Sequence, residues 1–219
     1  MKVCTDACIL GAWAAKAFHG KEINNIIDVG CGTGLLSLML AQKVNGLIDA
    51  VEIDPGASLQ ACENIMSSPW KGRITVINLA IQLIATHKKY NLIISNPPFY
   101  EGDLRSPLKE VNAAMHDTTL TLATLIDFIK HHLAASGSAI VLLPRSRTKY
   151  FEELSNEAGL FINQQLLIRH SSMHEHFRSV LLLSADQKNS VINELTIYDD
   201  QKNYTSSFKE LMEDYYLNF

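Results

Sequence analysis

The stretch "NNIIDVGCGTGLLSLML", residues 24–40, decides the fold, because an apolar strand, a glycine turn and a helix follow one another without a gap. Residues 24–30 form a short apolar run that ends in glycine, which is typical of a strand buried on both faces. Apolar residues then recur at helical spacing, so residues 34–44 are expected to form an amphipathic helix. The stretch therefore predicts the first strand and helix of an α/β sheet.

The same alternation continues along the chain. Strands are expected at residues 24–30, 47–54, 72–78, 90–95, 138–144, 161–170 and 177–185, with an optional one at 193–199. Helices are expected at residues 7–18, 34–44, 55–66, 118–136 and 206–217, and a further helix should follow the fifth strand and end at about residue 158. For the helix at residues 118–136, Asp117 or Thr118 is expected to cap the start and Gly137 to follow the end.

These elements predict the architecture of the sheet. Apolar strands that alternate with helices indicate parallel strands covered on both faces. The connection at residues 171–176 is too short for a helical crossover, so the last two long strands are expected to pair antiparallel. We predict an α/β fold with a seven-stranded, mostly parallel sheet, one antiparallel strand and helices on both faces.

Composition narrows the class of protein. The chain has 219 residues, a formal charge of −4, 47% hydrophobic and 19% charged residues, which predicts one compact domain over residues 1–219. No window is long and apolar enough for a membrane span, and the N-terminus does not read as a secretory signal. Four cysteines without CxxC pairing predict reduced thiols in a cytosolic protein. The acidic balance argues only weakly against nucleic acid as a partner.

The glycine turn is a candidate ligand site. Gly30, Gly32 and Gly34 permit positive φ and leave no Cβ to block a ligand at the following helix. Glu52 ends the second strand, where a carboxylate can accept hydrogen bonds from both hydroxyls of a ribose. A dinucleotide fingerprint would need glycine where Leu35 stands, so the spacing does not match it. The alternative is a tight turn followed by a surface glutamate.

The stretch "SNPPFYEGD", residues 95–103, places a rigid corner just after the fourth strand. Pro97 and Pro98 fix φ and donate no hydrogen bond, so the corner offers acceptors, namely the side-chain oxygen of Asn96 and the Pro97 carbonyl. Phe99 adds a ring on which a planar group can stack. We expect the corner to hold a planar group with an exocyclic amine, such as adenine, a glutamine amide or a guanine. A plain turn at a strand end is the alternative.

Both stretches carry a resemblance. "DVGCGTG" (28–34), which begins with Asp28, resembles motif I of class I S-adenosylmethionine-dependent methyltransferases, and "NPPF" (96–99) matches the [DNS]-P-P-[FYW] motif of amino-group methyltransferases. The resemblance implies a Rossmann-like class I fold with S-adenosyl-L-methionine as cofactor. It also implies that the glycine loop passes the methionyl part and that Glu52 holds the ribose. The chemistry then needs the amine lone pair placed in line with the methyl group.

Further stretches narrow the resemblance. "MKVCTDACILGAW" (1–13), "ENIMSSPWKGRI" (63–74), "NLIISNPPFY" (91–100) and "NYTSSFKELMEDYYL" (203–217), together with residues 28–42, resemble the tRNA(Val)-specific adenine-N6 methyltransferase family nearly end to end. The resemblance implies methylation of adenine 37 in tRNA(Val). We expect a cytoplasmic protein without a metal; the sequence leaves the oligomeric state open, with a monomer favoured. The catalytic residues implied are Asn96, Pro97, Pro98 and Phe99. The cofactor-binding residues implied are Lys2, Thr5, Asp6, Asp28, Gly30, Gly32, Gly34, Glu52, Ile53, Ala80, Ile81 and Asn96.

The sequence departs from that family at three places. Family members usually carry a further segment before the element that begins here at Met1, so we expect an N-terminal extension to be missing. Ala80 stands where an acid commonly holds the adenine amine, and a backbone amide near Ile81 is the expected substitute. Met115 and His116 stand where an arginine–histidine pair is common, and a capping or core position is expected for His116.

For other charged residues the sequence allows two interpretations, contact with RNA or an ordinary solvated surface. His170, His174, His176 and Glu175 lie in a hairpin loop without helical register, so a metal site is not expected there. These histidines are instead candidates to face RNA phosphates, and the alternative is an ordinary solvated surface. The same two readings apply to Arg145, Arg147, Lys149, Arg169 and Arg178.

Three other functions stay open from the sequence. The same proline corner suits an N5-glutamine methyltransferase that acts on a translation factor. It also suits an amino-group methyltransferase of ribosomal RNA or DNA. A cofactor-binding module that has lost catalysis is the non-enzymatic alternative, suggested by Ala80 and by the missing N-terminal segment.

Overall fold

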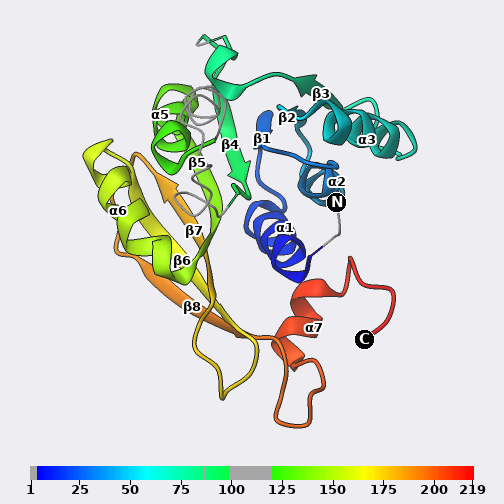
Figure 1. Cartoon of the computed structure of the whole chain (residues 1–219), viewed down its shortest axis with the longest axis vertical. Helices are drawn as coiled ribbons and strands as arrows, with labels where there is room; N and C mark the ends of the chain where they lie inside the picture. Colours follow the sequence, from blue (N-terminus) through cyan, green and yellow to red (C-terminus); the bar gives the residue numbers. More distant parts are fainter. Residues whose placement is uncertain (1–3, 86, 99–119) are drawn as a thin grey trace, which may run out of the picture.

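The computed structural model describes residues 4–85, 87–98 and 120–219. In this part of the chain the strands form a sheet of order β3-β2-β1-β4-β5-β7-β6-β8 (Figure 1). Its strands are β1 (Asn25–Val29), β2 (Leu47–Glu52), β3 (Ile74–Asn78), β4 (Tyr90–Ser95), β5 (Leu133–Pro144), β6 (Phe161–Arg169), β7 (Arg178–Ser184) and β8 (Val191–Thr196).

Among the described strands, β7 alone runs against the others. It pairs antiparallel with both β5 and β6, whereas β3, β2, β1, β4 and β5 are parallel neighbours and β8 is parallel to β6. The expected single antiparallel strand and the antiparallel pairing of the last two long strands are confirmed. The optional strand near residues 193–199 forms β8, so the sheet has eight strands where seven were expected.

Helices cover both faces of the sheet (Figure 1). They are α1 (Thr5–Phe18), α2 (Leu35–Ala41), α3 (Pro55–Met66), α5 (Leu122–His132), α6 (Thr148–Glu157) and α7 (Ser206–Met212), with short 3-10 turns η1 (Ile81–Leu83) and η2 (Arg145–Arg147). Successive strand residues point to opposite faces, so Ile26 joins the core under α1, α2, α3 and α7, while Ile27 joins the core under α5 and α6. Both residues have no exposed surface.

The helix expected at residues 118–136 is the clearest error of the sequence analysis. The described part of it, α5, begins after Thr121, whose hydroxyl accepts a hydrogen bond from the Thr124 amide at 3.0 Å. Asp117 and Thr118 lie outside the described residues. The helix ends at His132 because Leu133 already pairs with Tyr90 of β4. Tertiary pairing overrides helix propensity here, and Gly137 lies inside β5 instead of past a helix end.

The C-terminal helix is also shorter than predicted. It ends at Met212, and beyond it Tyr216 and Phe219 turn back onto Tyr204, with ring centroids 6.4 and 6.0 Å away. This aromatic cluster continues the core that α1 and α7 share. The remaining boundaries agree with the sequence analysis to within a few residues.

Two further observations concern the chain as a whole. All four cysteines, Cys4, Cys8, Cys31 and Cys62, are free thiols. Among the described residues, no helix has the length and apolar character needed to cross a membrane.

Gly137 is predicted to be essential for β5. A Cβ built there would lie 2.9 Å from the Tyr90 carbonyl oxygen and 3.0 Å from the Ala134 carbonyl oxygen. Gly137→Ala should therefore lower the free energy of unfolding by about 1–3 kcal/mol, measured by urea denaturation. Gly72→Ala is the matched control, because nothing lies within 4 Å of its Cβ position. Equal midpoints for the two variants would contradict this account of β5.

Candidate functional site

The glycine turn between β1 and α2 has the predicted backbone conformation. Gly30, Gly32 and Gly34 have φ values of 72°, 56° and 83°, a region that favours glycine. The amides of Gly30 and Cys31 both donate to the Val51 carbonyl at 2.9 Å, which ties the turn to β2. The turn is thus rigid and presents backbone rather than side chains at the start of α2.

Glu52 lies against this turn. The Gly32 amide donates to its Oε2 at 2.8 Å and the Asp54 amide donates to its Oε1 at 2.9 Å. The side chain is largely buried at the end of β2. Two amide donors fix the orientation of the carboxylate, and each oxygen keeps a lone pair for a further donor. A sugar diol supplies two such donors.

Asp28 is buried under the same turn. Its Oδ2 accepts from the Ser37 amide at 3.1 Å and from the Ser37 hydroxyl at 2.7 Å, while its Oδ1 has no hydrogen-bond partner in the part of the chain that the structure describes. Burial raises the pKa of Asp28 to about 7; the hydrogen bonds from Ser37 oppose this rise and the charge of Glu52 adds to it. A buried acceptor without a donor is costly, so Oδ1 is suited to a ligand that brings a donor or a positive charge.

The proline corner stands beside the glycine turn. Ser95 pairs with Val29 in the parallel ladder, and the Ser95 hydroxyl donates to the Val29 carbonyl at 2.9 Å. Asn96 therefore follows β4 at the level where Gly30 follows β1, on strands about 4.8 Å apart. The side-chain oxygen of Asn96 is shielded from solvent and has no hydrogen-bond partner among the described residues. Two acceptors that lack donors, on Asp28 and Asn96, thus lie at one edge of the sheet.

A cavity of about 40 Å³ opens between the ends of β1 and β2 and the segment after β3. It is lined by Gly30, Val51, Glu52, Ile53, Leu79, Ala80, Ile81, Gln82 and Leu120. Ile53 is 44% exposed there, an apolar side chain with one face uncovered. The enclosed part of this space holds only a few water molecules, and the cavity is open to solvent at its mouth.

The structure brings several predicted residues together and adds others. Gly30, Glu52, Ile53, Ala80 and Ile81 line this one cavity, as their assignment to one site requires. Four further lining residues, Val51, Leu79, Gln82 and Leu120, were not predicted from the sequence. In "LAIQ" (79–82), Gln82 is the polar residue nearest to Ala80 in the sequence. This proximity is the signal that could have identified Gln82. An amide side chain there can both donate to and accept from the edge of a purine.

Other predicted residues lie apart from this cavity. Thr5 and Asp6 begin α1 and do not line it, and Asp6 accepts from Arg178 Nε at 2.9 Å. Lys2, Phe99 and His116 lie outside the described residues. The described residues also include no group of three or more His, Cys, Asp or Glu side chains placed to hold a metal ion.

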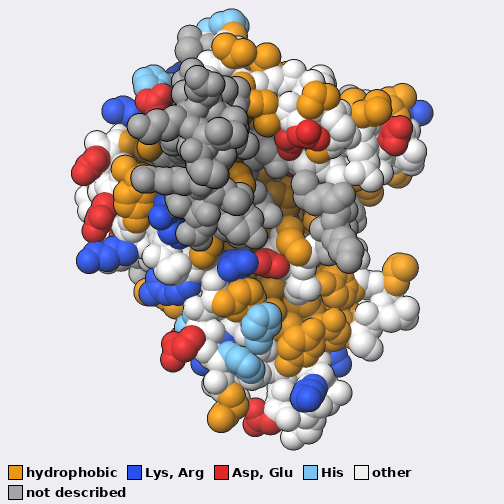
Figure 2. Space-filling model, in the orientation of Figure 1, with side chains coloured by type: hydrophobic (Ala, Val, Ile, Leu, Met, Phe, Trp, Pro, Cys, Tyr) orange, Lys and Arg blue, Asp and Glu red, His pale blue; other side chains and the backbone are white. Residues whose placement is uncertain are grey.

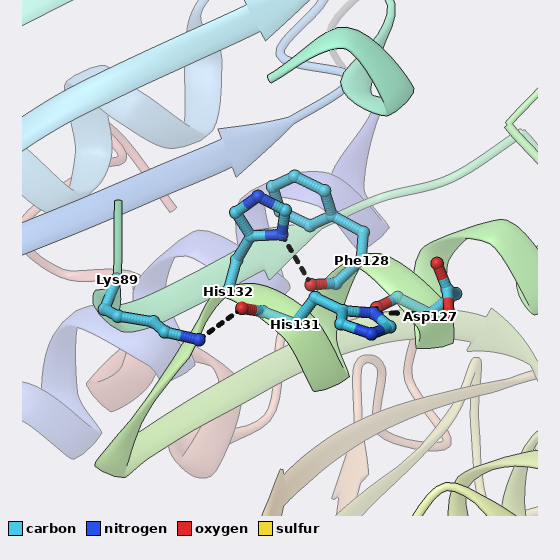
Figure 3. A network of polar contacts seen from close by, with 5 residues as sticks. All are labelled: Lys89, Asp127, Phe128, His131 and His132. Atoms are coloured by element: carbon cyan, nitrogen blue, oxygen red, sulfur yellow. Dashed lines mark hydrogen bonds and ion pairs between the residues drawn. The ribbon is translucent and has the colours of Figure 1, made fainter. Parts of the chain in front are cut away.

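A second cavity, of about 270 Å³, shares Ile81 and Gln82 with the first and is bounded by α5. On α5, the His132 ring stacks on Phe128 with centroids 4.0 Å apart, and His132 Nδ1 lies 3.0 Å from the Phe128 carbonyl (Figure 3). Lys89 Nζ donates to the His131 carbonyl at the end of the same helix. The first two contacts lie within α5, and the third ties the end of α5 to Lys89, directly before β4.

The residues present fit S-adenosylmethionine. Its ribose diol needs paired acceptors, which the two carboxylate oxygens of Glu52 would offer, and its ammonium group needs a buried acceptor, which Asp28 Oδ1 would offer. Its adenine needs an apolar wall, for which Ile53 and Ile81 are placed. Among the described residues, the cavity lining offers oxygen acceptors and backbone amides and no Lys or Arg side chain. These groups suit a nucleoside that carries a cationic tail.

Comparison with known proteins identifies the class. A family model described as "Methyltransferase small domain" matches residues 13–159, which include the glycine turn, Glu52 and the proline corner. A predicted O-methyltransferase from Agrobacterium tumefaciens, known from its crystal structure, superposes with a TM-score of 0.69. The superposition covers 95% of this chain and 96% of that one at 14% identity, so it bears on the fold alone. The chain is a methyltransferase with the class I fold.

Two relatives identify the family within this class of methyltransferases. The tRNA1(Val) (adenine(37)-N6)-methyltransferase of Dyadobacter fermentans is 38% identical over 224 residues, which span 100% of this chain and 92% of the relative. The protein of the same name from Pectobacterium carotovorum is 38% identical over 221 residues, which span 99% and 88%. The chain belongs to this tRNA1(Val) (adenine(37)-N6)-methyltransferase family.

The raised pKa of Asp28 predicts a dependence of stability on pH. The unfolded chain loses this proton near pH 3.8, whereas the folded chain keeps it to about pH 7. The free energy of unfolding contributed by Asp28 is therefore fully present below pH 3.8 and is lost as pH rises to about 7. Asp28→Asn should remove this loss.

The measurement is urea denaturation of both proteins without ligand at pH 4.5 and pH 8. Between these values the wild type should lose more stability than Asp28→Asn. If the two proteins lose the same amount, Asp28 is already ionised in the folded chain at low pH.

Proposed function

We propose that this protein transfers a methyl group from S-adenosyl-L-methionine to N6 of adenine 37 in tRNA1(Val). The names of its full-length relatives support the substrate. The observation that supports the chemistry most directly is the side-chain oxygen of Asn96, a shielded acceptor without a partner, one strand away from the glycine turn. Such an acceptor is suited to an amine hydrogen.

In this proposal the cofactor supplies an electrophilic methyl group when it is bound, and the chain positions it. Glu52 accepts from the ribose hydroxyls and Asp28 accepts from the ammonium group. Gly30, Gly32 and Gly34 allow close approach of the methionyl part to the backbone. Ile53, Ala80, Ile81 and Gln82 surround the adenine, with Gln82 as the polar side chain that reads its edge.

The target adenine is held by the proline corner. The Asn96 side-chain oxygen and the Pro97 carbonyl accept from its exocyclic amine, and Pro98 keeps the corner rigid. We assign the stacking surface to Phe99. Two acceptors orient the amine lone pair toward the methyl group, and orientation of this kind is the main catalytic contribution the site can make. An adenine in a folded tRNA must first leave its stack to reach the corner.

Other predicted features enter as parts of the same proposal. Lys2, Thr5 and Asp6 border the methionyl end, and Arg178 holds Asp6 in place. The whole chain acts as one methyltransferase domain, as a monomer without a metal, in the cytoplasm where tRNA is modified. The relatives do not favour methylation of a glutamine side chain, of ribosomal RNA or of DNA, nor an inactive module.

Asn96→Ala tests the proposed chemistry. The variant should lose at least about 100-fold in the turnover number, because a group aimed at the reacting atom is removed. The readout is mass spectrometry of nucleosides from unmodified tRNA1(Val) after incubation with enzyme and cofactor. The affinity for S-adenosylhomocysteine, measured by calorimetry, should stay within about threefold of wild type. Retained activity in the variant would remove the corner from the mechanism, and a wild type that forms no N6-methyladenosine would end the proposal.

Glu52→Gln tests the cofactor site. The variant keeps the size of the side chain but replaces one carboxylate oxygen with a donor, so S-adenosylhomocysteine should bind about 1–3 kcal/mol more weakly. Glu63→Gln is the control, since Glu63 is an exposed acid on α3 that does not line the cavity. An unchanged dissociation constant for Glu52→Gln would exclude a role for this carboxylate in ribose binding.

A further inference from the structure

Residues 145–149 and 169–178, together called the basic edge, lie at the same edge of the sheet as Asn96. β5 ends at Pro144 and β6 ends at Arg169, both parallel to β4, while antiparallel β7 begins at Arg178. Pro144 pairs with Arg178, and the Arg145 amide donates to the Phe177 carbonyl at 3.0 Å. The ends of β4, β5 and β6 and the start of β7 therefore lie in one row along this edge of the sheet.

The charge of the chain is divided unevenly. The basic edge contains five Lys and Arg residues and one acid, Glu175. The rest of the chain holds the other 14 of 19 basic residues and 22 of 23 acids. An acidic protein thus concentrates positive charge beside its proposed catalytic corner. Figure 2 shows Lys, Arg and His side chains on the part of this face that carries α6 and strands β6 to β8.

Two cations of the basic edge already form ion pairs within the protein. Arg178 pairs with Asp6 at 2.9 Å, and Arg169 lies 3.5 Å from Glu194. Arg145 and Lys149 differ, because both are exposed and neither pairs with an acid among the described residues. These two cations are available to a polyanion without first breaking an ion pair.

The basic edge also presents stacked rings. His170 stacks on Phe177 with ring centroids 4.1 Å apart and planes 6° from parallel, and the Arg178 guanidinium lies 5.3 Å from the Phe177 centroid. Phe177 packs against the core, which anchors the stack, whereas His170 is exposed. Cations interleaved with aromatic rings are the combination that binds unpaired RNA, phosphates on the cations and bases on the rings.

The distance between His170 and Asn96 suits an RNA strand that contacts the basic edge and also reaches the proline corner. From β4 through β5 and β7 to β6 there are three strand intervals, so His170 lies roughly 14 Å along the edge from Asn96. A few unstacked nucleotides span that distance. We propose that the basic edge binds the RNA next to the methylated adenine, with Arg145 and Lys149 on phosphates and a flanking base on His170. This inference rests on the proposed function.

The test compares tRNA binding by three variants. Arg145→Ala with Lys149→Ala should weaken tRNA binding about 10-fold or more in 0.15 M salt and lower the slope of log Kd against log salt by roughly 2. His170→Ala should weaken binding about 5-fold or more while leaving that slope unchanged. Lys71→Ala with Lys188→Ala removes the same charge from exposed positions at the opposite edge and should change Kd less than about twofold.

Two further readouts separate the outcomes. All variants should bind S-adenosylhomocysteine as the wild type does, and should reach its turnover number at saturating tRNA, because the basic edge does not touch the reacting atoms. If the control pair weakens tRNA binding as much as the Arg145–Lys149 pair, or if the salt slope is unchanged, the assignment of the basic edge is wrong while the proposed function stands. A wild type that neither binds nor methylates tRNA would overturn both.

Discussion

The register of β4 against β1 is the constraint on which the site depends. Ser95 lies opposite Val29, and the buried hydrogen bond between the Ser95 hydroxyl and the Val29 carbonyl fixes that pairing at the end where both strands stop. Side chains alternate along a strand, so a slip of one residue would turn Asn96 to the other face of the sheet. The glycine turn and the proline corner would then no longer face one space. The β1–β2 pairing does the same for Glu52, which reaches the Gly32 amide across the turn.

The buried acids give this edge an electrostatic character of its own. Asp28 is shielded from water and lies near the carboxylate of Glu52, and both effects oppose its ionisation. A positive group at the turn would reverse that balance, because it stabilises the ionised form. Binding of a cationic ligand and release of a proton from Asp28 are therefore linked. The basic edge has the opposite sign, so the acidic and basic groups of the site are separated along one row of strand ends.

Much of the fold could be predicted from local sequence patterns, and the errors of that prediction have physical causes. The strand–turn–helix at residues 24–40 was recognisable because three glycines, an apolar strand and an amphipathic helix all agree. The boundary between α5 and β5 was not, because residues 134–136 suit a helix and only the pairing of Leu133 with Tyr90 makes them a strand. Within the site, Glu52 and Ile53 could be predicted as site residues because they lie at the end of a strand. The contact of Asp6 with Arg178 joins residues 172 positions apart, and no local pattern encodes it.

That long-range contact has a consequence for synthesis. α1 packs against α2, which follows it closely in the chain, but its contacts with α7 and the Asp6–Arg178 ion pair form only when the last strands and helix have been made. At roughly 5–20 residues per second, the ribosome needs on the order of ten seconds or more between these two ends. During that interval the apolar face of α1 lacks part of its cover, which makes it a natural substrate for chaperones that hold nascent chains. The edge at which RNA would bind also needs β5, β6 and β7, so it can assemble only after Arg178 has been made.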